Sequence, residues 1–268
     1  MDSTQHFNRL AATYEQGRPA YAEALIDALY RDCGFSAQSV IADIGAGTGK
    51  LAEQLLRRGS TVYAVEPGAD MRRTATEKLD HYPRFHAVDG TAEATTLPDH
   101  VVDLVTAAQA FHWFDPLAFE RECRRILRPG GRICLIWNMR QMEDPLNREA
   151  FAIYTAYCPR FHGFNGGILP DDPRIVRFFD GQYQTLSFDH PLCYQKPQFL
   201  SRSLSGSYSL QQGDPQFEPY YRALSELFDR HAAGGRLTLA NRTVCYLGRL
   251  PEAEGAQSPL ERRSSHAG

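Results

Sequence analysis

Short apolar runs alternate with amphipathic segments through the first half of the chain. The runs are rich in β-branched and aliphatic residues, which predicts strands, and they lie at 39–44, 61–65, 84–88, 101–107 and 132–137. Between them, apolar residues recur at the spacing of a helix, at 49–58, 69–79 and 116–127. Consecutive strands joined by helices need crossover connections, so this pattern predicts an α/β fold with a doubly wound, mainly parallel sheet.

The rhythm changes after Asn138. Helical spacing continues in three segments, at 145–157, 197–204 and 217–231. A Gly- and Pro-rich stretch at 159–173 predicts a loop. The runs 182–194 and 236–250 alternate like strands and predict a late antiparallel strand pair at the sheet edge. Together with the earlier runs they predict a seven-stranded sheet whose second half carries a helical cap insertion.

We expect a single domain over residues 1–250, with its core at 36–138 and the cap at about 145–235. The tail 252–268 is polar and rich in Ser, Ala and charge, which predicts disorder. The six cysteines are scattered singly, without a pair or a histidine at metal-ligand spacing, so we expect no zinc site and no disulfide framework. Most should be buried thiols.

Composition narrows the class of partner. The chain of 268 residues is 43% hydrophobic and carries a formal charge of −3, without the basic surplus typical of proteins that bind nucleic acid or anionic membranes. The first ten residues are polar, and no run approaches the roughly 20 apolar residues that span a bilayer. We therefore expect a cytoplasmic protein that acts on a small molecule, with no nucleic acid or membrane as partner.

Three glycines follow the first predicted strand and precede a helix. Gly45, Gly47 and Gly49 are separated by single residues in the sequence D-I-G-A-G-T-G-K from Asp43 to Lys50. Glycine permits positive φ and has no Cβ, so a ligand can approach this turn closely. A plain turn would not need three glycines, and the pattern therefore predicts a cofactor site.

The turn by itself admits two cofactors. The segment from Gly47 to Ala52 fits the dinucleotide pattern G-x-G-x-x-A, and Glu66 lies at a suitable distance to bind a ribose. Asp43, two residues before the first glycine, favours a cofactor that carries an amino acid, because its carboxylate can meet an ammonium group that a dinucleotide lacks. A nicotinamide-dependent oxidoreductase and a non-catalytic cofactor-binding protein remain alternatives.

Six short segments, in this order, resemble the class I S-adenosylmethionine-dependent methyltransferases, and among them the small-molecule branch of the ubiquinone-biosynthesis and trans-aconitate enzymes. The resemblance spans Phe7 to Trp137. It is carried by F-N-R-L-A-A-T-Y with R-P-A-Y in 7–21, D-I-G-A-G-T-G in 43–49, V-E-P in 65–67, G-T-A-E in 90–93, A-Q-A-F-H-W-F in 108–114 and R-P-G-G in 128–131. It implies a Rossmann-like methyltransferase fold.

The resemblance also implies roles for individual residues toward S-adenosylmethionine. Residues 1–30 would form a lid that closes over the cofactor. Glu66 would bind the ribose hydroxyls, and Asp43 the methionine end. The remaining implied contacts are Tyr14 and Arg18 from the lid, the glycines of the turn (Gly45, Gly47 and Gly49), Thr91 and Ala92 beside the adenine, and Ala108 at the exit of the fourth strand.

His112 and Trp113 follow the fourth strand at its carboxyl end, where ligands bind in open α/β sheets. We expect both to face the transferred methyl group, with His112 as a candidate general base or a packing residue and Trp113 as a wall of the pocket. The acceptor site must include residues of the second half, and the candidates are Arg202, Tyr208, Tyr220, Tyr221 and His231. Arg202 suits a carboxylate acceptor, whereas a phenol, amine or carbon acceptor makes more use of His112.

Overall fold

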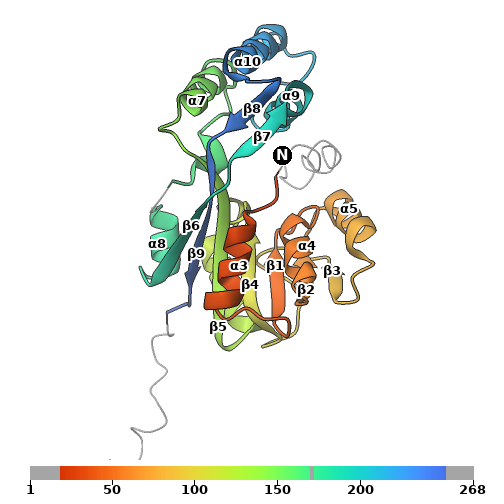
Figure 1. Ribbon diagram of the computed structural model, residues 1–268. Helices are drawn as coiled ribbons and strands as arrows, with labels where there is room; N and C mark the ends of the chain where they lie inside the picture. The colour runs from red at the N-terminus through yellow and green to blue at the C-terminus, as the bar shows by residue number, and fades with distance from the viewer. Residues whose placement is uncertain (1–18, 170–171, 252–268) are drawn as a thin grey trace, which may run out of the picture.

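A seven-stranded sheet forms the centre of the computed structural model, which describes residues 19–169 and 172–251 (Figure 1). Neighbouring strands are parallel except for β9, which is antiparallel to β5 on one side and to β6 on the other. In spatial order the strands are β3 (Phe85–Val88), β2 (Thr61–Val65), β1 (Val40–Ile44), β4 (Val102–Ala108), β5 (Leu127–Arg140), β9 (Asn241–Gly248) and β6 (Tyr183–Asp189). The predicted mainly parallel α/β sheet is confirmed.

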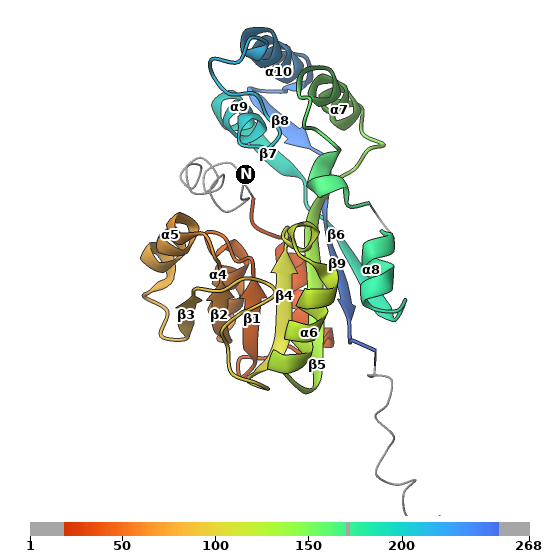
Figure 2. The same ribbon diagram turned by 180° about the vertical axis from the view of Figure 1, so that it is seen from behind.

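Helices cover both faces of this sheet (Figures 1 and 2). Buried side chains of α3 (Glu23–Asp32) and α4 (Lys50–Arg57) form one core cluster, which Leu79 of α5 (Ala69–Leu79) joins. Those of α6 (Pro116–Ile126) and α8 (Pro173–Phe178) form a cluster on the other face. Successive residues of β5 alternate between the two clusters, as the pleat of a strand buried on both faces requires.

A separate cap stands at one end of the sheet (Figures 1 and 2). Its core is a third cluster of buried residues, built largely from aromatic and leucine side chains. The cap elements that supply this cluster are α7 (Pro145–Tyr157), β7 (Leu192–Gln195), α9 (Lys196–Leu204), α10 (Phe217–His231) and β8 (Arg236–Leu239). The predicted cap range of 145–235 also contains α8 and β6, and both of these pack in the sheet part.

Each of the two late strands is divided in the structure. The run 182–194 forms β6 and β7, and the run 236–250 forms β8 and β9. β6 pairs with β9 inside the large sheet, whereas β7 and β8 pair with each other in the cap. The strand pair is therefore antiparallel as predicted, but it extends beyond the sheet edge, and β9 lies between β5 and β6 instead of at the edge.

Two further differences from the predicted elements concern α3 and β5. Residues 23–30, part of the predicted lid, belong to α3, which packs on the sheet. The segment 128–131, predicted as a turn before the fifth strand, is a bulge inside β5, where the pairing with β4 shifts register between Val102 and Leu104. Gly130 permits this bulge with a φ of +80°.

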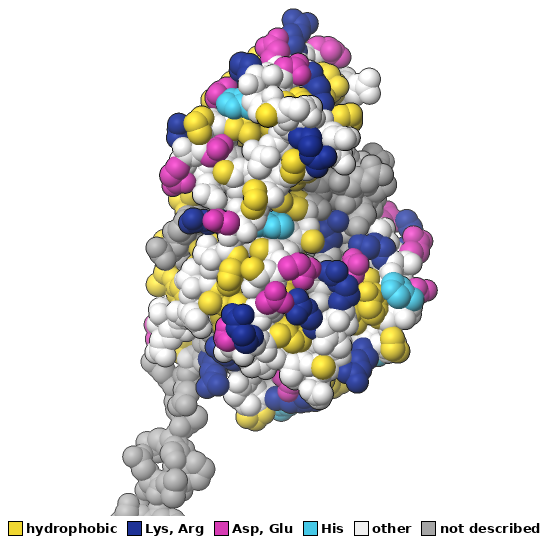
Figure 3. Space-filling view, in the orientation of Figure 1, with side chains coloured by type: hydrophobic (Ala, Val, Ile, Leu, Met, Phe, Trp, Pro, Cys, Tyr) yellow, Lys and Arg dark blue, Asp and Glu magenta, His cyan; other side chains and the backbone are white. Residues whose placement is uncertain are grey.

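The visible surface of the sheet part mixes charges of both signs (Figure 3). Arg57 and Arg58 of α4, for example, pair with Glu23 and Asp27 of α3. All six cysteines are free, and five of them are buried, as predicted; Cys193 is exposed. Among the residues that the structure describes, no helix combines the length and apolar character needed to cross a membrane.

Candidate active site

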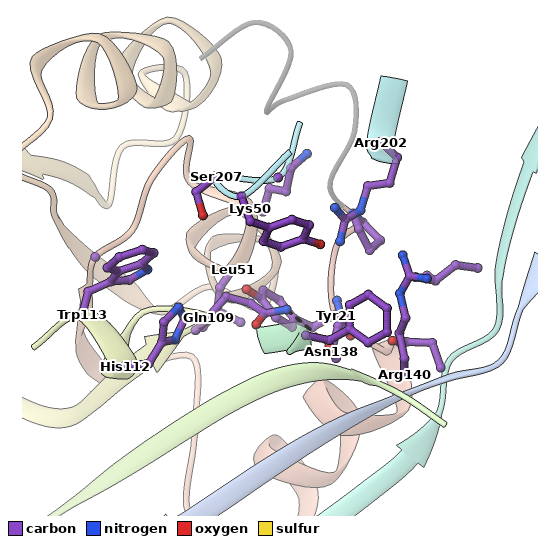
Figure 4. A pocket seen from close by; sticks show the side chains of 18 of the residues that line it. Tyr21, Lys50, Leu51, Gln109, His112, Trp113, Asn138, Arg140, Arg202 and Ser207 are labelled. Atoms are coloured by element: carbon purple, nitrogen blue, oxygen red, sulfur yellow. Dashed lines mark hydrogen bonds between the residues drawn. The ribbon is translucent and has the colours of Figure 1, made fainter. Parts of the chain in front are cut away.

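A cavity of about 320 Å³ lies where the carboxyl ends of the central strands meet the cap (Figure 4). Its floor comes from the turn after β1, the exit of β4 and the end of β5. Its upper wall comes from the loop after α7 and from α9 with the residues that follow it. Ligands of open α/β sheets bind at this edge, and the volume is that of a small-molecule site.

The glycine turn after β1 adopts left-handed backbone conformations at all three glycines, with φ of +68° at Gly45, +57° at Gly47 and +80° at Gly49. A Cβ on Gly45 would lie 2.7 Å from the Cβ of Ala110, and one on Gly49 would lie 2.5 Å from Cδ1 of Leu79. A Cβ on Gly47 would meet nothing within 4 Å. Gly45 and Gly49 are therefore required by packing within the protein, and Gly47 presents backbone to open space.

The first turn of α4 points toward the same cavity. Its N-cap, Gly49, supplies no side-chain hydrogen bond, and the Asp43 carboxyl interacts with the N–H of Ala52 in this turn. Thr48 lies in the cavity wall, and its hydroxyl is buried without a hydrogen-bond partner in the described chain. A buried hydroxyl without a partner is costly, which favours a polar ligand at this point.

Asp43 of the central strand β1 forms part of the cavity wall, and only 1% of the residue is exposed. Its Oδ1 accepts a hydrogen bond from Thr106 Oγ1 at 2.9 Å, while Oδ2 is buried and finds no donor among residues 19–169 and 172–251. Burial raises the pKa of this carboxyl to about 7, because desolvation disfavours the charged form. The orphaned oxygen is suited to receive a cationic donor from a ligand.

Glu66 ties the turn after β1 to the turn after β2. Its Oε2 accepts the backbone N–H of Gly47 at 2.9 Å, and its Oε1 accepts that of Gly68 at 2.8 Å. Burial raises its pKa, although both backbone donors act against that shift. Each oxygen keeps a second acceptor position, so the carboxylate can brace the turn and still bind two hydroxyl groups.

The segment after β4 brings its side chains to the cavity through a short 3-10 helix, η1 (Phe111–Trp113). Phe111 is buried and packs edge-on against Trp137 and Phe178, which fixes the segment to the sheet. The cavity is lined by Ala108, His112 and Trp113, as predicted, and also by Gln109, whose φ of +55° is unusual for a residue with a side chain.

The chain enters the site region from its N-terminal side along a segment, Ala20 to Ala22, that is held by several backbone hydrogen bonds. The carbonyl of Ala20 accepts hydrogen bonds from Asn138 Nδ2 and His190 Nε2, and Gln54 bonds both backbone groups of Tyr21. The N–H of Ala22 donates to Thr243 Oγ1. Tyr21 lines the cavity. The predicted contacts Tyr14 and Arg18 lie outside the described residues.

On the cap side, two of the five acceptor candidates, Arg202 and Tyr208, line the cavity. Tyr208 is held by ring contacts with Phe161 and Tyr154. The other candidates do not take part: the Tyr220 hydroxyl is buried in the cap beside the Ser203 carbonyl, and His231 pairs with Glu149. Tyr221 is partly exposed on α10, away from this cavity.

Sequence reasoning missed several polar residues of the cavity, among them Asn138, Arg140 and Arg160. Asn138 and Arg140 end β5, so the rule that selected His112 at the end of β4 would have selected them. Arg160 lies in the loop after α7, and nothing in its sequence context marks it. Thr91 and Ala92 follow β3 at the same sheet edge but outside the cavity lining, and Ala92 is buried in the core.

This strand order, with an antiparallel strand between the last two parallel ones and a glycine turn and a carboxylate at the ends of β1 and β2, defines a Rossmann-like methyltransferase. A methyltransferase-domain family model matches residues 42–135. A structure from Anaeromyxobacter dehalogenans, provisionally described as a type II methyltransferase, superposes with a TM-score of 0.61 and 23% identity over 87% of this chain and 99% of its own.

Curated relatives are also described as methyltransferases. An uncharacterized methyltransferase of Geobacillus thermodenitrificans is 32% identical over 175 residues, which cover 62% of this chain and 77% of the relative. One of Mycobacterium tuberculosis is 42% identical over 139 residues, 52% of this chain and 54% of the relative, so that match spans about half of each protein. The chain belongs to the class I S-adenosylmethionine-dependent methyltransferases. The narrower resemblance to the ubiquinone and trans-aconitate branch stays a prediction.

The glycine turn generates a prediction about stability. Gly49→Ala should lower the free energy of unfolding by about 2–4 kcal/mol, because left-handed strain adds to a clash with Leu79. Gly47→Ala introduces the left-handed strain without a clash, so it should lower the free energy of unfolding by about 1–2 kcal/mol. Urea unfolding of the two variants measures the difference, and equal losses would contradict the assigned role of Leu79.

Proposed function

We propose that this methyltransferase takes its methyl group from S-adenosylmethionine and transfers it to a small-molecule acceptor. The observation that carries the proposal is the buried Oδ2 of Asp43, an acceptor without a donor in the described chain, at the cavity wall. A carboxylate in this position needs a cationic donor, and the ammonium group of the methionine moiety supplies one. Nicotinamide cofactors have no such group.

Further residues fit the rest of the cofactor. The two free acceptor positions of Glu66 suit the two ribose hydroxyls, and Gly47 leaves room for close approach to the backbone. The positive end of the α4 dipole favours the carboxylate of the methionine moiety. Thr91 and Ala92 beside the adenine, and Tyr14 and Arg18 from the N-terminal segment, complete the proposed set.

When bound, S-adenosylmethionine supplies a methyl group on a positively charged sulfur, which an acceptor atom attacks in line. The side chains of this protein hold the acceptor against that methyl group and exclude water from it, and orientation alone accounts for large rate effects. Trp113 lines the cavity, and in this proposal His112 beside it takes a proton from an acceptor that must lose one. We also propose that the protein is cytoplasmic and has no nucleic-acid partner.

Calorimetry with S-adenosylhomocysteine and with NAD tests the cofactor. We expect S-adenosylhomocysteine to bind and NAD not to bind. Glu66→Gln should weaken the binding at least about tenfold, because one amide oxygen cannot replace two charged acceptors. Glu77→Gln, an exposed change on α5, is the matched control. Binding of NAD alone would contradict the proposal.

The pKa of Asp43 predicts how cofactor affinity depends on pH. Below about pH 7 the carboxyl is protonated and cannot attract the ammonium group, so S-adenosylhomocysteine should bind progressively less tightly, by up to about tenfold per pH unit. Asp43→Asn should bind weakly at pH 8 and show a flat profile between pH 6 and 8.

The stability of the same variant separates this effect from misfolding. The folded-state pKa of Asp43 lies above its unfolded value, so ionisation costs folding energy that is fully felt above pH 7. Asp43→Asn should therefore melt no lower than the wild type at pH 8. An unchanged pH profile of binding in the well-folded variant would contradict the role of Asp43.

His112→Ala tests the proposed proton acceptor. If the accepting atom loses a proton, labelled-methyl transfer should slow by about 100-fold, while the affinity for S-adenosylhomocysteine stays within about threefold. The measurement uses S-adenosylmethionine labelled in the methyl group and a panel of phenols, amines and carboxylic acids. Unchanged turnover on the best acceptor would leave His112 a packing residue.

A further inference from the structure

Three arginines from three separate elements line the cavity: Arg140 at the end of β5, Arg160 after α7 and Arg202 on α9. Among the lining residues that the structure describes, Asp43 is the only one with a carboxylate, and it lies on the proposed cofactor side. In Figure 4, Arg140 and Arg202 lie together at one end of the cavity, and His112 and Trp113 lie at the other. The acceptor end of the site is therefore strongly positive.

These arginines differ from most others in the protein, because no carboxylate of the described chain forms an ion pair with them. Arg125, by contrast, holds Glu122 at 2.6 Å and Asp99 at 2.7 Å. Similar pairs hold Arg31 of α3, Arg57 of α4 and Arg124 of α6. The cavity thus gathers three arginines without a carboxylate partner in the described chain, whereas the visible surface is mixed (Figure 3).

Arg140 carries the strongest indication. Its Nη1 is buried and has no acceptor within the described ranges. The guanidinium carbon lies 4.3 Å from the centre of the Phe164 ring, a cation–π contact that holds the group in place. A buried, charged donor without an acceptor is costly, and a ligand anion removes that cost.

We propose that the methyl acceptor is a small organic acid whose carboxylate is bound by Arg140 and Arg202, with the exposed Arg160 at the rim. This inference rests on the proposed methyl transfer. Guanidinium groups match the two oxygens of a carboxylate in geometry and charge. The cavity of about 320 Å³ must also hold the methionine end of the cofactor, which limits the acceptor to a small molecule.

The same contacts make the carboxylate an anchor and not the methylated group. Its oxygen lone pairs are engaged by arginine N–H groups, which lowers their nucleophilicity. The attacking atom then belongs to a second functional group of the acid, at the end of the cavity near His112. Its lone pair forms the new bond to the methyl carbon, the electron pair of the carbon–sulfur bond goes to sulfur, and any proton lost goes to His112. The product keeps its carboxylate.

Thermal-shift measurements on protein saturated with S-adenosylhomocysteine test the anchor. The probes are aliphatic and aromatic mono- and dicarboxylates, each with its amide, and a matching set of phosphate monoesters. We expect at least one carboxylate to raise the melting temperature and its amide not to do so. The proposal would be overturned if phosphate esters alone raised the melting temperature, or if no carboxylate in the panel did so. Failure of S-adenosylhomocysteine itself to bind would instead count against the proposed function.

Variants then assign the contacts. Arg140→Gln and Arg202→Gln should each weaken binding of the active carboxylate at least about tenfold, with little change in the affinity for S-adenosylhomocysteine. Arg177→Gln, an exposed arginine of α8 outside the cavity, is the matched control. Carboxylate binding that survives in both variants, with their melting temperatures intact, would contradict the inference. With labelled S-adenosylmethionine, a base-labile methyl ester as product would exclude the anchor role.

Discussion

Glu66 forms two hydrogen bonds on which the geometry of the site depends. Its carboxylate accepts one backbone N–H from the turn after β1 and one from the turn after β2, at 2.9 and 2.8 Å. The glycines of the first turn have left-handed backbone conformations, and Gly47 lies beyond the end of β1. Gly49 is the N-cap of α4 and lies close to the side chain of Leu79. A single acidic side chain thus connects two strand ends, one helix start and the position proposed for a ribose.

The sheet and the cap contribute groups of opposite charge to the cavity. The sheet supplies Asp43, a carboxyl group of the cavity wall whose pKa is raised by burial. Glu66 holds the glycine turn beside it from outside the described lining. The cap and the end of β5 supply donors, the three arginines without carboxylate partners in the described chain. The cationic ammonium group of S-adenosylmethionine and an anionic acceptor would be drawn to different walls of the same cavity.

The sequence was sufficient to predict the first half because local periodicity and turn chemistry determine it. β2, α5 and α7 begin and end at the predicted residues, and Asp43, Ala108 and His112 reach the cavity as expected. The second half depends on contacts between distant segments. Pro191, which has no N–H for a ladder, marks the break between β6 and β7 in the sequence itself. The place of Arg160 depends on how the cap packs, which no local pattern encodes.

The way the cap is joined to the sheet bears on which changes the sheet can accommodate. Asp189 of β6 pairs with Arg242 of β9, and the backbone of His190 still bonds to Asn241. Residues 191–240 therefore occupy the position of a hairpin loop between β6 and β9, and this loop carries the cap elements other than α7. The pairing of β6 with β9 uses none of its residues, so a change of length within the loop need not shift the register of the sheet. The family model ends at residue 135, before the first cap element begins.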